Sequence, residues 1–302
     1  MPLLQVEAEK LSLEVLERGV IEEIIHRDDL FALLPFMPIN GKAYLYNREN
    51  TLTEGDFLDP YDTVNEGGAT FTEVTTQLRI LAGDVDLDKF LVTTMSDHNS
   101  QLAIQLAAKA KALGFTFRRA VVQGSNAINP KSFDGLAVLT DASMVLVAGA
   151  NGASVTMSMI DELRDLVILP GGPDCYMMRR STWRAFKALL RAMNGNTATE
   201  VMLENFGRPV PAIDGIPVIL NDWIPNNEVQ GTNSATTSIY ALRLNEIDGF
   251  HGIVGNNMAG IAVEEIGTIQ TKDAVRYRVK WYVGTALKST LSVARLKGVT
   301  NV

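Results

Sequence analysis

An acidic segment without a basic residue most strongly constrains how this chain can fold. From Glu49 to Leu78 the sequence has no Lys or Arg and seven acids: Glu49, Glu54, Asp56, Asp59, Asp62, Glu66 and Glu73. The flanking stretches 43–47 (AYLYN) and 70–81 (TFTEVTTQLRIL) are rich in residues that favour strands. The pattern predicts a long β-finger. Because an isolated two-stranded hairpin is marginal in water, we expect it to lie on another surface, although a solvated loop also fits the pattern.

A long amphipathic helix is predicted over residues 97–122. Its apolar residues recur at steps of three or four: Leu102, Leu106, Ala110, Leu113, Phe117 and Val121. Asp97 or Ser96 is suited to cap its N-terminus. At 1.5 Å per residue this helix is about 39 Å long, more than most helices of globular proteins, so we expect it to act as a strut.

The N-terminal region reads as an arm. Residues 5–26 have helical periodicity, and Pro35 and Pro38 make the next stretch extended. A short helix followed by an extended apolar strap suits a segment that packs on something else.

The rest of the chain alternates helices and strands. We expect helices at 154–168 and at 182–193, the second capped by Ser181, and a buried strand at 175–180. Asp214-Gly215 predicts a hairpin turn. Further strands are expected near 236–244, 260–270, 274–284 and 289–297, with the last two flanking a short turn.

Composition excludes several classes of protein. The chain has 302 residues, with 46% apolar and 21% charged residues, which is ordinary for a folded protein. Its 27 Lys+Arg and 35 Asp+Glu give a formal net charge of −8. This charge disfavours sequence-specific binding to nucleic acids and binding to an anionic membrane surface. Cys175 is the only cysteine, so an internal disulfide and a cysteine-rich zinc site are excluded. No apolar run approaches 18 residues, and Glu7 and Glu9 stand where a signal peptide needs apolar residues, so we expect a soluble intracellular protein.

The sequence offers weak candidates for catalysis. Phosphate-loop, dinucleotide-binding and G-x-S-x-G motifs are absent, and His26, His98 and His251 lie far apart in the sequence. His98 beside Asp97 resembles a base with its orienting carboxylate, but helix starts commonly carry such residues as caps. Cys175 follows a glycine-rich turn, yet free cysteine is usually a small core residue.

The other groups of charged residues fit the solvent-exposed surface better than a catalytic site. Asp28-Asp29 and Asp86-Asp88 are typical of solvated loop acids. A basic group can meet phosphate or an acidic partner: Arg179, Arg180, Arg184 and Arg191. We therefore expect no catalytic, cofactor-binding or metal site, and an assembly protein rather than an enzyme.

The order of these parts resembles the major capsid proteins of tailed double-stranded DNA phages, which have the Hong Kong 97-type capsid fold. The strut is followed by Phe133-Asp134-Gly135-Leu136, and Ser181-Thr182-Trp183 opens a helix. Gly207-Arg208-Pro209-Val210 leads to Asp214-Gly215-Ile216-Pro217-Val218, and the tail carries RYRVKWYVG and LSVARLKGV. The resemblance covers nearly the whole chain.

The resemblance implies an α+β fold with four parts. Residues 1–42 would form the N-terminal arm and 43–82 the extended E-loop. Residues 83–136 and 261–302 would form the peripheral domain with its spine helix at 97–122, and 137–260 the axial domain.

The resemblance also implies how the protein assembles, what its partners are and where it is found. Hexamers and pentamers would tile an icosahedral shell around non-specifically bound double-stranded DNA, with a portal and separate scaffolding or cement proteins as partners. The protein would belong to the virion, assembled in the host cytoplasm, without cofactor or membrane. Because no lysine lies between Lys42 and Lys89, a finger-borne isopeptide crosslink is not available. Only about 42 residues precede the finger, so a scaffolding segment within the chain is not expected.

The finger is the expected contact between subunits. Its acids Glu54, Asp56, Asp59, Asp62 and Glu66 would meet basic residues of a neighbour, first Arg118 and Arg119 on the strut and then Lys109 and Lys111. The apolar residues Phe57, Leu58, Tyr61 and Phe71 would supply the buried area.

Three other interpretations stay open. An encapsulin-type nanocompartment shell uses the same fold around protein cargo. An α/β hydrolytic enzyme is a remote alternative, and a phage tail or decoration protein is a third.

Overall fold

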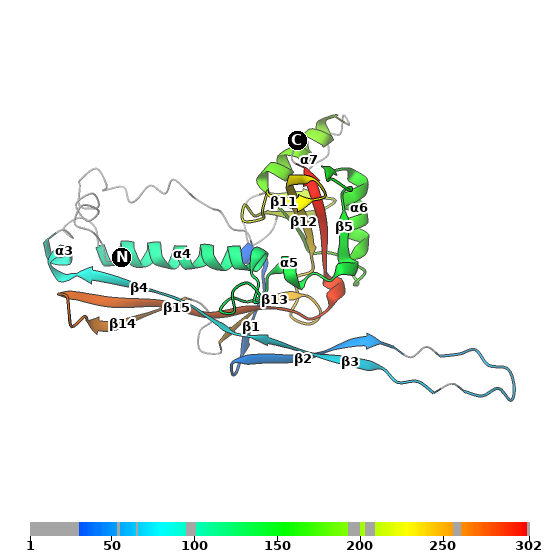
Figure 1. Cartoon of the computed structure of the whole chain (residues 1–302), viewed down its shortest axis with the longest axis horizontal. Coiled ribbons are helices and arrows are strands. Elements are labelled where there is room, and N and C mark those ends of the chain that lie inside the picture. Colours follow the sequence, from blue (N-terminus) through cyan, green and yellow to red (C-terminus); the bar gives the residue numbers. More distant parts are fainter. Residues whose placement is uncertain are drawn as a thin grey trace.

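The computed structural model describes residues 30–52, 55–64, 66–94, 101–192, 200–202, 209–255 and 261–300. The expected helix at 5–26 lies outside them, as do Ser96, Asp97 and His98. Within the described residues the strands form a five-stranded sheet, a nine-stranded sheet and a two-stranded ribbon. We call the first the long sheet, the second the wide sheet and the ribbon the finger (Figure 1). The fold is α+β, as expected.

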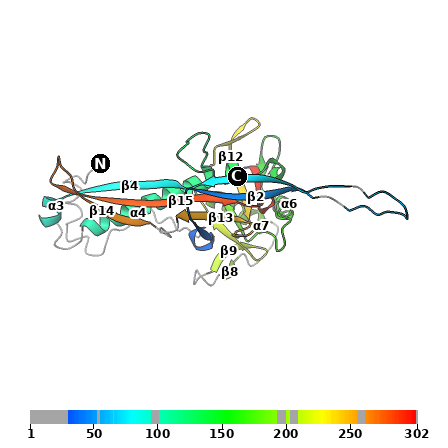
Figure 2. The same ribbon diagram turned by 90° about the horizontal axis from the view of Figure 1, so that it is seen from below.

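The long sheet is built around one extended strand. Its strands are β1 (Phe36–Ile39), β4 (Arg79–Asp88), β13 (Phe250–Gly255), β14 (Ala262–Thr268) and β15 (Ala274–Leu287). β15 pairs antiparallel with β4 along one edge and with β14 and β13 along the other, and β1 adds parallel to β13. Figure 2 shows β4 and β15 running side by side along the length of the molecule.

The wide sheet contains the most buried strands. Its strands are β5 (Val145–Val147), β6 (Ala153–Ser154), β7 (Cys175–Met178), β8 (Glu200–Met202), β9 (Pro209–Ile213), β10 (Ile216–Leu220), β11 (Glu228–Gln230), β12 (Asn233–Leu242) and β16 (Val293–Thr300). All four residues of β7 are buried between β12 and β10. The turn between β9 and β10 uses Asp214 at φ 50° and Gly215 at φ 82°, which confirms the predicted hairpin.

The helices lie on the sheets. They are α2 (Leu30–Leu33), α3 (Lys89–Thr94), α4 (Gln101–Gln123), α5 (Leu136–Leu139), α6 (Met157–Leu166) and α7 (Arg180–Ala192), with short 3₁₀ helices η2 (Ala142–Met144) and η3 (Thr290–Ser292). α4 is the predicted strut, and it packs on β4 and β15 (Figure 1). α7 begins at Arg180 and not after Ser181, because β7 runs almost directly into it and the Trp183 amide already bonds the Arg179 carbonyl at 3.0 Å.

The predicted F-D-G-L motif fixes the end of the strut. The Gly135 amide donates to the Gly124 carbonyl at 2.8 Å, and the Asp134 carboxylate accepts from the Asn126 amide at 2.7 Å. A Cβ on Gly124 would lie 2.4 Å from the carbonyl oxygens of both Ala120 and Phe133, so only glycine fits this crossing. Beneath it, Leu136 is fully buried.

Three hydrophobic clusters form in the described residues, and the two larger ones hold the body together. One lies between the strut and the two sheets, where the Phe117 ring is tilted against Trp281 and Phe133, with ring centroids 4.8 Å and 5.6 Å apart. The other lies between the wide sheet and the helices α6 and α7, around residues such as Leu163 and Phe186. The finger contributes to neither of these two clusters, but Tyr44 and Tyr46 at its root pack against the third, small cluster of Ile39, Ile253 and Ala286.

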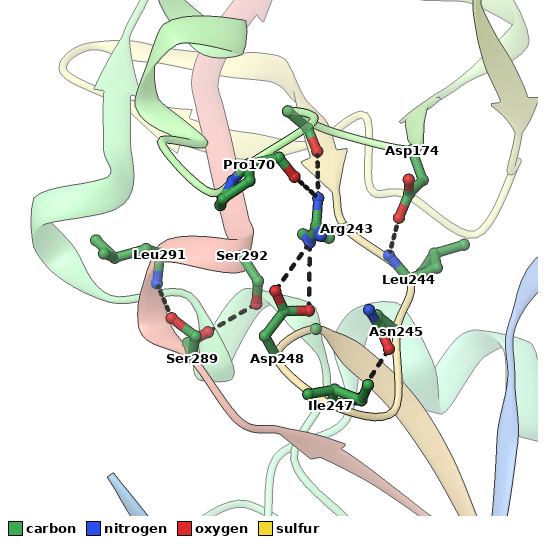
Figure 3. A network of polar contacts seen from close by, with 12 residues as sticks. Pro170, Asp174, Arg243, Leu244, Asn245, Ile247, Asp248, Ser289, Leu291 and Ser292 are labelled. Atoms are coloured by element: carbon green, nitrogen blue, oxygen red, sulfur yellow. Dashed lines mark hydrogen bonds and ion pairs between the residues drawn. The ribbon is translucent and has the colours of Figure 1, made fainter. Parts of the chain in front are cut away.

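The two sheets exchange strands at one junction. The chain passes from β12 to β13 through residues 243–249 and returns from β15 to β16 through 288–292. At this junction the Arg243 guanidinium donates to the Gly172 carbonyl at 3.3 Å and to Asp248 at 3.2 Å, and also to the Pro170 carbonyl (Figure 3). The Arg243 amide donates to the Ser292 carbonyl at 2.9 Å, which ties the two crossings together.

The last two strands flank a short turn, as expected, but they lie in different sheets. β16 pairs within the wide sheet, and β15 and β13 pair within the long sheet. Strand order along the sequence does not reveal such an exchange, because both crossings are short and polar.

Candidate functional site: the finger and the sheet beside its root

The finger is a two-stranded ribbon that leaves the body. β2 (Ala43–Thr51) pairs antiparallel with β3 (Thr70–Gln77), in register from Ala43 opposite Gln77 to Arg48 opposite Thr72. Figures 1 and 2 both show it projecting beyond the sheets, with its tip far from α4 and β4. The chain enters β4 one residue after β3, so the ribbon itself ends at Gln77.

The root of the finger is hydrogen-bonded to the end of β15. Tyr46 donates through its hydroxyl to the Leu287 carbonyl at 2.6 Å, and Arg48 donates through Nε to the Lys288 carbonyl at 2.7 Å. Tyr44 lies edge-on to His251, with ring centroids 6.2 Å apart. These contacts set the direction in which the finger leaves the body.

A tight turn forms the tip. The Asp62 amide donates to the Asp59 carbonyl at 3.1 Å, and the Asp59 amide donates to the Asp62 carboxylate at 2.9 Å. Pro60 takes the second position of this turn and Tyr61 the third, with φ 79°. A positive φ at the third position fits a type II turn, which usually places glycine there, so Tyr61 holds a strained backbone.

The predicted contact residues of the tip point away from any core. Phe57 and Tyr61 are fully exposed, and Leu58 and Phe71 are also exposed. Asp56, Asp59, Asp62 and Glu66 are exposed, while Glu54 lies outside the described residues. No described residue of the same chain covers the two aromatic rings. The structure therefore brings the tip residues together, and no described residue of the same chain covers them.

The basic residues of the strut that were expected to meet the finger's acids differ in their exposure and contacts. Arg118 is half-buried, with its guanidinium 5.4 Å from the Phe115 ring centre, and only Arg119 is exposed. Lys109 lies over β4, where a Cβ added to Gly83 would come within 2.2 Å of its Cε. Lys111 lies 5.7 Å from the Phe115 ring centre. Three of the four cations are thus already engaged with their own chain.

The face of the long sheet opposite the strut carries a ladder of ion pairs. Arg276 binds Asp86 through two hydrogen bonds of 2.6 and 2.7 Å, and Arg278 binds Asp84 through two of 2.7 and 2.9 Å. Lys280 pairs with Glu264. Hydrogen bonds from the guanidinium groups of Arg278 and Arg276 hold the pKa values of Asp84 and Asp86 below their ordinary range. Asp86 is therefore part of this ladder rather than a solvated loop acid.

Sequence analysis missed a hollow at the near end of the same face. It lies beside the finger's root, and its lining consists of Gly41, Lys42, Leu78, Arg79, Ile80, Lys131 and Tyr282. Of its lining, Ile80 is 74% exposed and Lys42 and Lys131 are exposed, while the Arg79 guanidinium donates to the Asn126 side chain at 2.9 Å. The alternation of β4 (RILAGDVDLD) does place Ile80 on the face of Asp84 and Asp86, but pairing with Tyr282 is visible only in the structure.

The residues considered for catalysis or phosphate binding do not come together in one site. Cys175 is fully buried, and burial raises the pKa of its thiol well above the ordinary value, which disfavours the nucleophilic thiolate. His251 is buried in β13, and His26 lies outside the described residues. Of the basic group, Arg179 donates to the carbonyls of Asp222 and Ile224, and Arg180 pairs with the Asp222 carboxylate at 2.9 Å.

The described residues provide neither a cluster of metal ligands nor a membrane-spanning helix. They contain no group of three or more His, Cys, Asp or Glu side chains placed to hold a metal ion. Among the helices in the part of the chain that the structure describes, none is both long enough and apolar enough to cross a membrane.

Comparisons with known proteins find similarity in structure and not in sequence. No protein-family model matches this sequence, and neither does any curated protein. The holo-SrpI encapsulin complex from Synechococcus elongatus PCC 7942 is similar with a TM-score of 0.76 and 19% identity, over 100% of this chain and 98% of that one. The capsid of the native GTA particle has a TM-score of 0.68 and 14% identity, over 93% of both chains. The Mycobacterium phage Bobi protein has a TM-score of 0.65 and 14% identity, over 97% of both chains. Together with the long strut, the projecting finger and the two sheets, these similarities show that the chain has the Hong Kong 97-type capsid fold.

Proposed function

We propose that this chain is the repeating subunit of a closed icosahedral shell, assembled as hexamers and pentamers of identical copies. The observation that carries the proposal is the finger tip, where Phe57 and Tyr61 are fully exposed on a ribbon that projects from the body. Large apolar side chains gathered on a protruding element are typical of interaction sites. Symmetric overlap of identical copies would cover every tip in the same way.

The first candidate content is packaged double-stranded DNA, which would make the chain the major capsid protein of a tailed phage. The similarities to the GTA capsid and to the phage Bobi protein support it. With a net charge of −8, the chain would contact DNA weakly and without sequence preference. A portal protein, and separate scaffolding or cement proteins, would then be its partners within the virion.

The second candidate is an encapsulin-type shell around protein cargo. The SrpI encapsulin favours it, because its TM-score of 0.76 exceeds the 0.68 and 0.65 of the two capsids above. Both candidates share the same assembly and differ in what the shell encloses.

We also propose that the chain has a structural rather than a catalytic role. The buried thiol of Cys175 and the ion-paired Asp86 support this. Their chemistry is already committed within the fold.

Electron microscopy of the purified 33.0 kDa protein tests the proposed assembly. We expect closed particles of uniform diameter, together with hexamers or pentamers as smaller species. A protein that stays monomeric at high concentration would contradict the proposal. Particles from the native source then separate the two contents: nuclease-protected DNA of one length supports the phage capsid, and a stoichiometric co-purifying protein supports the encapsulin-type shell.

A further inference from the structure

One segment of this acidic chain gathers positive charge. Between Asp174 and Glu200 the sequence has no acid and five basic residues, which are Arg179, Arg180, Arg184, Lys187 and Arg191. The formal net charge of the whole chain is −8, so this segment separates positive charge from the rest of the molecule. The structure places most of it on β7 and α7.

Four of these five cations follow one face of α7. Arg180, Arg184, Lys187 and Arg191 come at steps of four, three and four residues. This spacing brings side chains onto the same side of a helix. At 1.5 Å per residue the row is about 16 Å long.

The opposite face of α7 fixes the helix on the wide sheet. Thr182, Trp183 and Phe186 are buried, and the rings of Trp183 and Phe186 stack with their centroids 5.6 Å apart. Packing therefore holds the helix and its row of cations in one orientation. In Figure 1, α7 lies at the top of the molecule, away from the finger.

The four cations differ in how far their own chain engages them. Arg180 pairs with Asp222 at 2.9 Å, and the Lys187 ammonium lies 5.3 Å from the centre of an aromatic ring on the same helix. Arg184 and Arg191 are exposed, and within the part of the chain that the structure describes neither forms an ion pair. Three charges of the row are thus not neutralised by a described acid.

The composition of this face fits a polyanion better than a protein. Between and beyond the cations it exposes Ala188 and Ala192, and none of the large apolar side chains of this fully described helix is exposed. Protein interfaces usually need an apolar core with large anchoring side chains, which this face lacks. Three of the four cations are arginines, whose planar group can donate two parallel hydrogen bonds to a phosphate.

The acidic face of α6 on a second copy is the competing occupant. Asp161, Glu162 and Asp165 are exposed there, but Arg164 is exposed among them and would bring a like charge to the row. A nucleic-acid backbone presents negative charge alone, at regular intervals. It therefore matches an unbroken row of cations better.

The same face favours a duplex over a single strand. Proteins that hold single strands usually stack the bases on exposed aromatic rings. The aromatic residues of α7 are Trp183 and Phe186, and both are buried. Contacts from this face would be limited to the phosphate backbone, which carries no direct sequence information.

We propose that the face of α7 formed by Arg184, Lys187 and Arg191 binds the phosphate backbone of double-stranded DNA. The inference rests on the first candidate content of the proposed shell and names the surface that meets it. One copy contributes few contacts, and the many copies of a shell multiply them.

Fluorescence anisotropy with a short labelled DNA duplex tests the binding, at protein concentrations low enough to keep the chain unassembled. Each neutralised phosphate adds about 0.9 to the salt dependence, so three contacts predict that log K falls with log salt with a slope of about −2.7. Two duplexes of unrelated sequence should bind equally, and a single strand of the same length should bind more weakly.

A matched pair of double variants locates the surface. Arg184→Gln/Arg191→Gln removes two of the three contacts and should weaken binding and reduce the slope to about −0.9. Lys131→Gln/Lys272→Gln changes the net charge equally at two exposed lysines outside α7, and it should keep the slope of the unmodified chain. Circular dichroism checks that both variants are folded. Equal slopes from the two variants would overturn the placement on α7.

Electron microscopy of the same proteins separates this inference from the shell function. If the unmodified chain forms particles but binds no duplex, the inference fails and the shell function stands. If Arg184→Gln/Arg191→Gln binds duplex as the unmodified chain does but no longer forms particles, α7 belongs to a contact between copies, and the inference fails as well. Duplex binding through α7 by a chain that never forms particles would support the surface and remove the shell function.

Discussion

Two phenylalanines show how differently one residue type is used in this chain. Phe117 is fully buried between the strut and the long sheet, in contact with Trp281 and Phe133. Phe57 is fully exposed on the finger. The first serves the fold of the subunit, and the second packs on no described residue of it.

Alanine substitution should separate these two roles. Phe117→Ala removes a large buried ring, and we expect it to lower the free energy of unfolding by about 3–5 kcal/mol. Phe57→Ala should change that free energy by less than about 0.5 kcal/mol, because its ring contacts no core. Urea unfolding of the unassembled protein measures both. A large loss of stability in Phe57→Ala would mean that the ring packs on its own chain.

His251 is a buried titratable residue under the root of the finger. Burial lowers its pKa from the ordinary 6.5, with Lys288 adding to the effect, while hydrogen bonding to the Gly249 carbonyl and the charge of Glu246 oppose it. Tyr44 packs against the ring. The folded protein therefore keeps His251 neutral at a pH where the unfolded chain binds a proton.

This difference predicts a loss of stability in mild acid. Above about pH 6.5 the histidine is neutral in both states and contributes no pH dependence. As the pH falls below that value, the unfolded state gains a proton first, so the free energy of unfolding decreases until the lower folded-state pKa is reached. Unfolding at pH 7.5 and pH 5 should show a smaller decrease for His251→Phe than for the unmodified protein. Equal decreases would assign the effect to other groups.

At the scale of elements, the finger is the part that depends least on the body. Its strands pair with each other, and its described contacts with the body are confined to the root, where Tyr46 and Arg48 bond the end of β15. The distal finger supplies no strand to the two sheets and no side chain to the two larger clusters.

Deleting residues 52–68 should leave a soluble, folded subunit that does not form closed shells. Replacing 55–64 with a Gly/Ser segment of equal length should have the same effect, because it keeps the ribbon's length and removes its chemistry. Circular dichroism and light scattering measure folding and assembly. Normal particles from either variant would refute the role assigned to the tip.

The elements that the sequence predicts are those specified by local signals. The strut shows in its helical spacing, the finger in its acidic gap between strand formers, and the β9–β10 hairpin in Asp214-Gly215. Pairing between distant segments leaves no such signal. Arg276 and Asp86 are 190 residues apart, and the hollow combines residues from 41 to 282. The tip of the candidate site was therefore predictable, whereas the hollow required the structure.

At the scale of the whole molecule, the junction around Arg243 sets how the two sheets are joined. Its guanidinium connects the turn at Pro170 and Gly172 with Asp248, beside the returning strand at Ser292 (Figure 3). A largely buried cation with several acceptors is costly to lose, because the acceptors keep their desolvation penalty.

Arg243→Met should lower the free energy of unfolding by about 1.5–3 kcal/mol, which is typical for hydrogen bonds to a charged group. Arg278→Met removes an ion pair from the exposed face of the long sheet and serves as the control, with a smaller expected change. Denaturant unfolding of the two variants compares them. Equal losses would mean that the junction carries no special share of the stability.

A density map of the assembled protein tests most directly whether one copy is completed by the next. We expect each finger to leave its own subunit and the rings of Phe57 and Tyr61 to rest on the long sheet of a neighbouring copy. Fingers folded back on their own subunits, or tips exposed to solvent in a closed particle, would contradict the account.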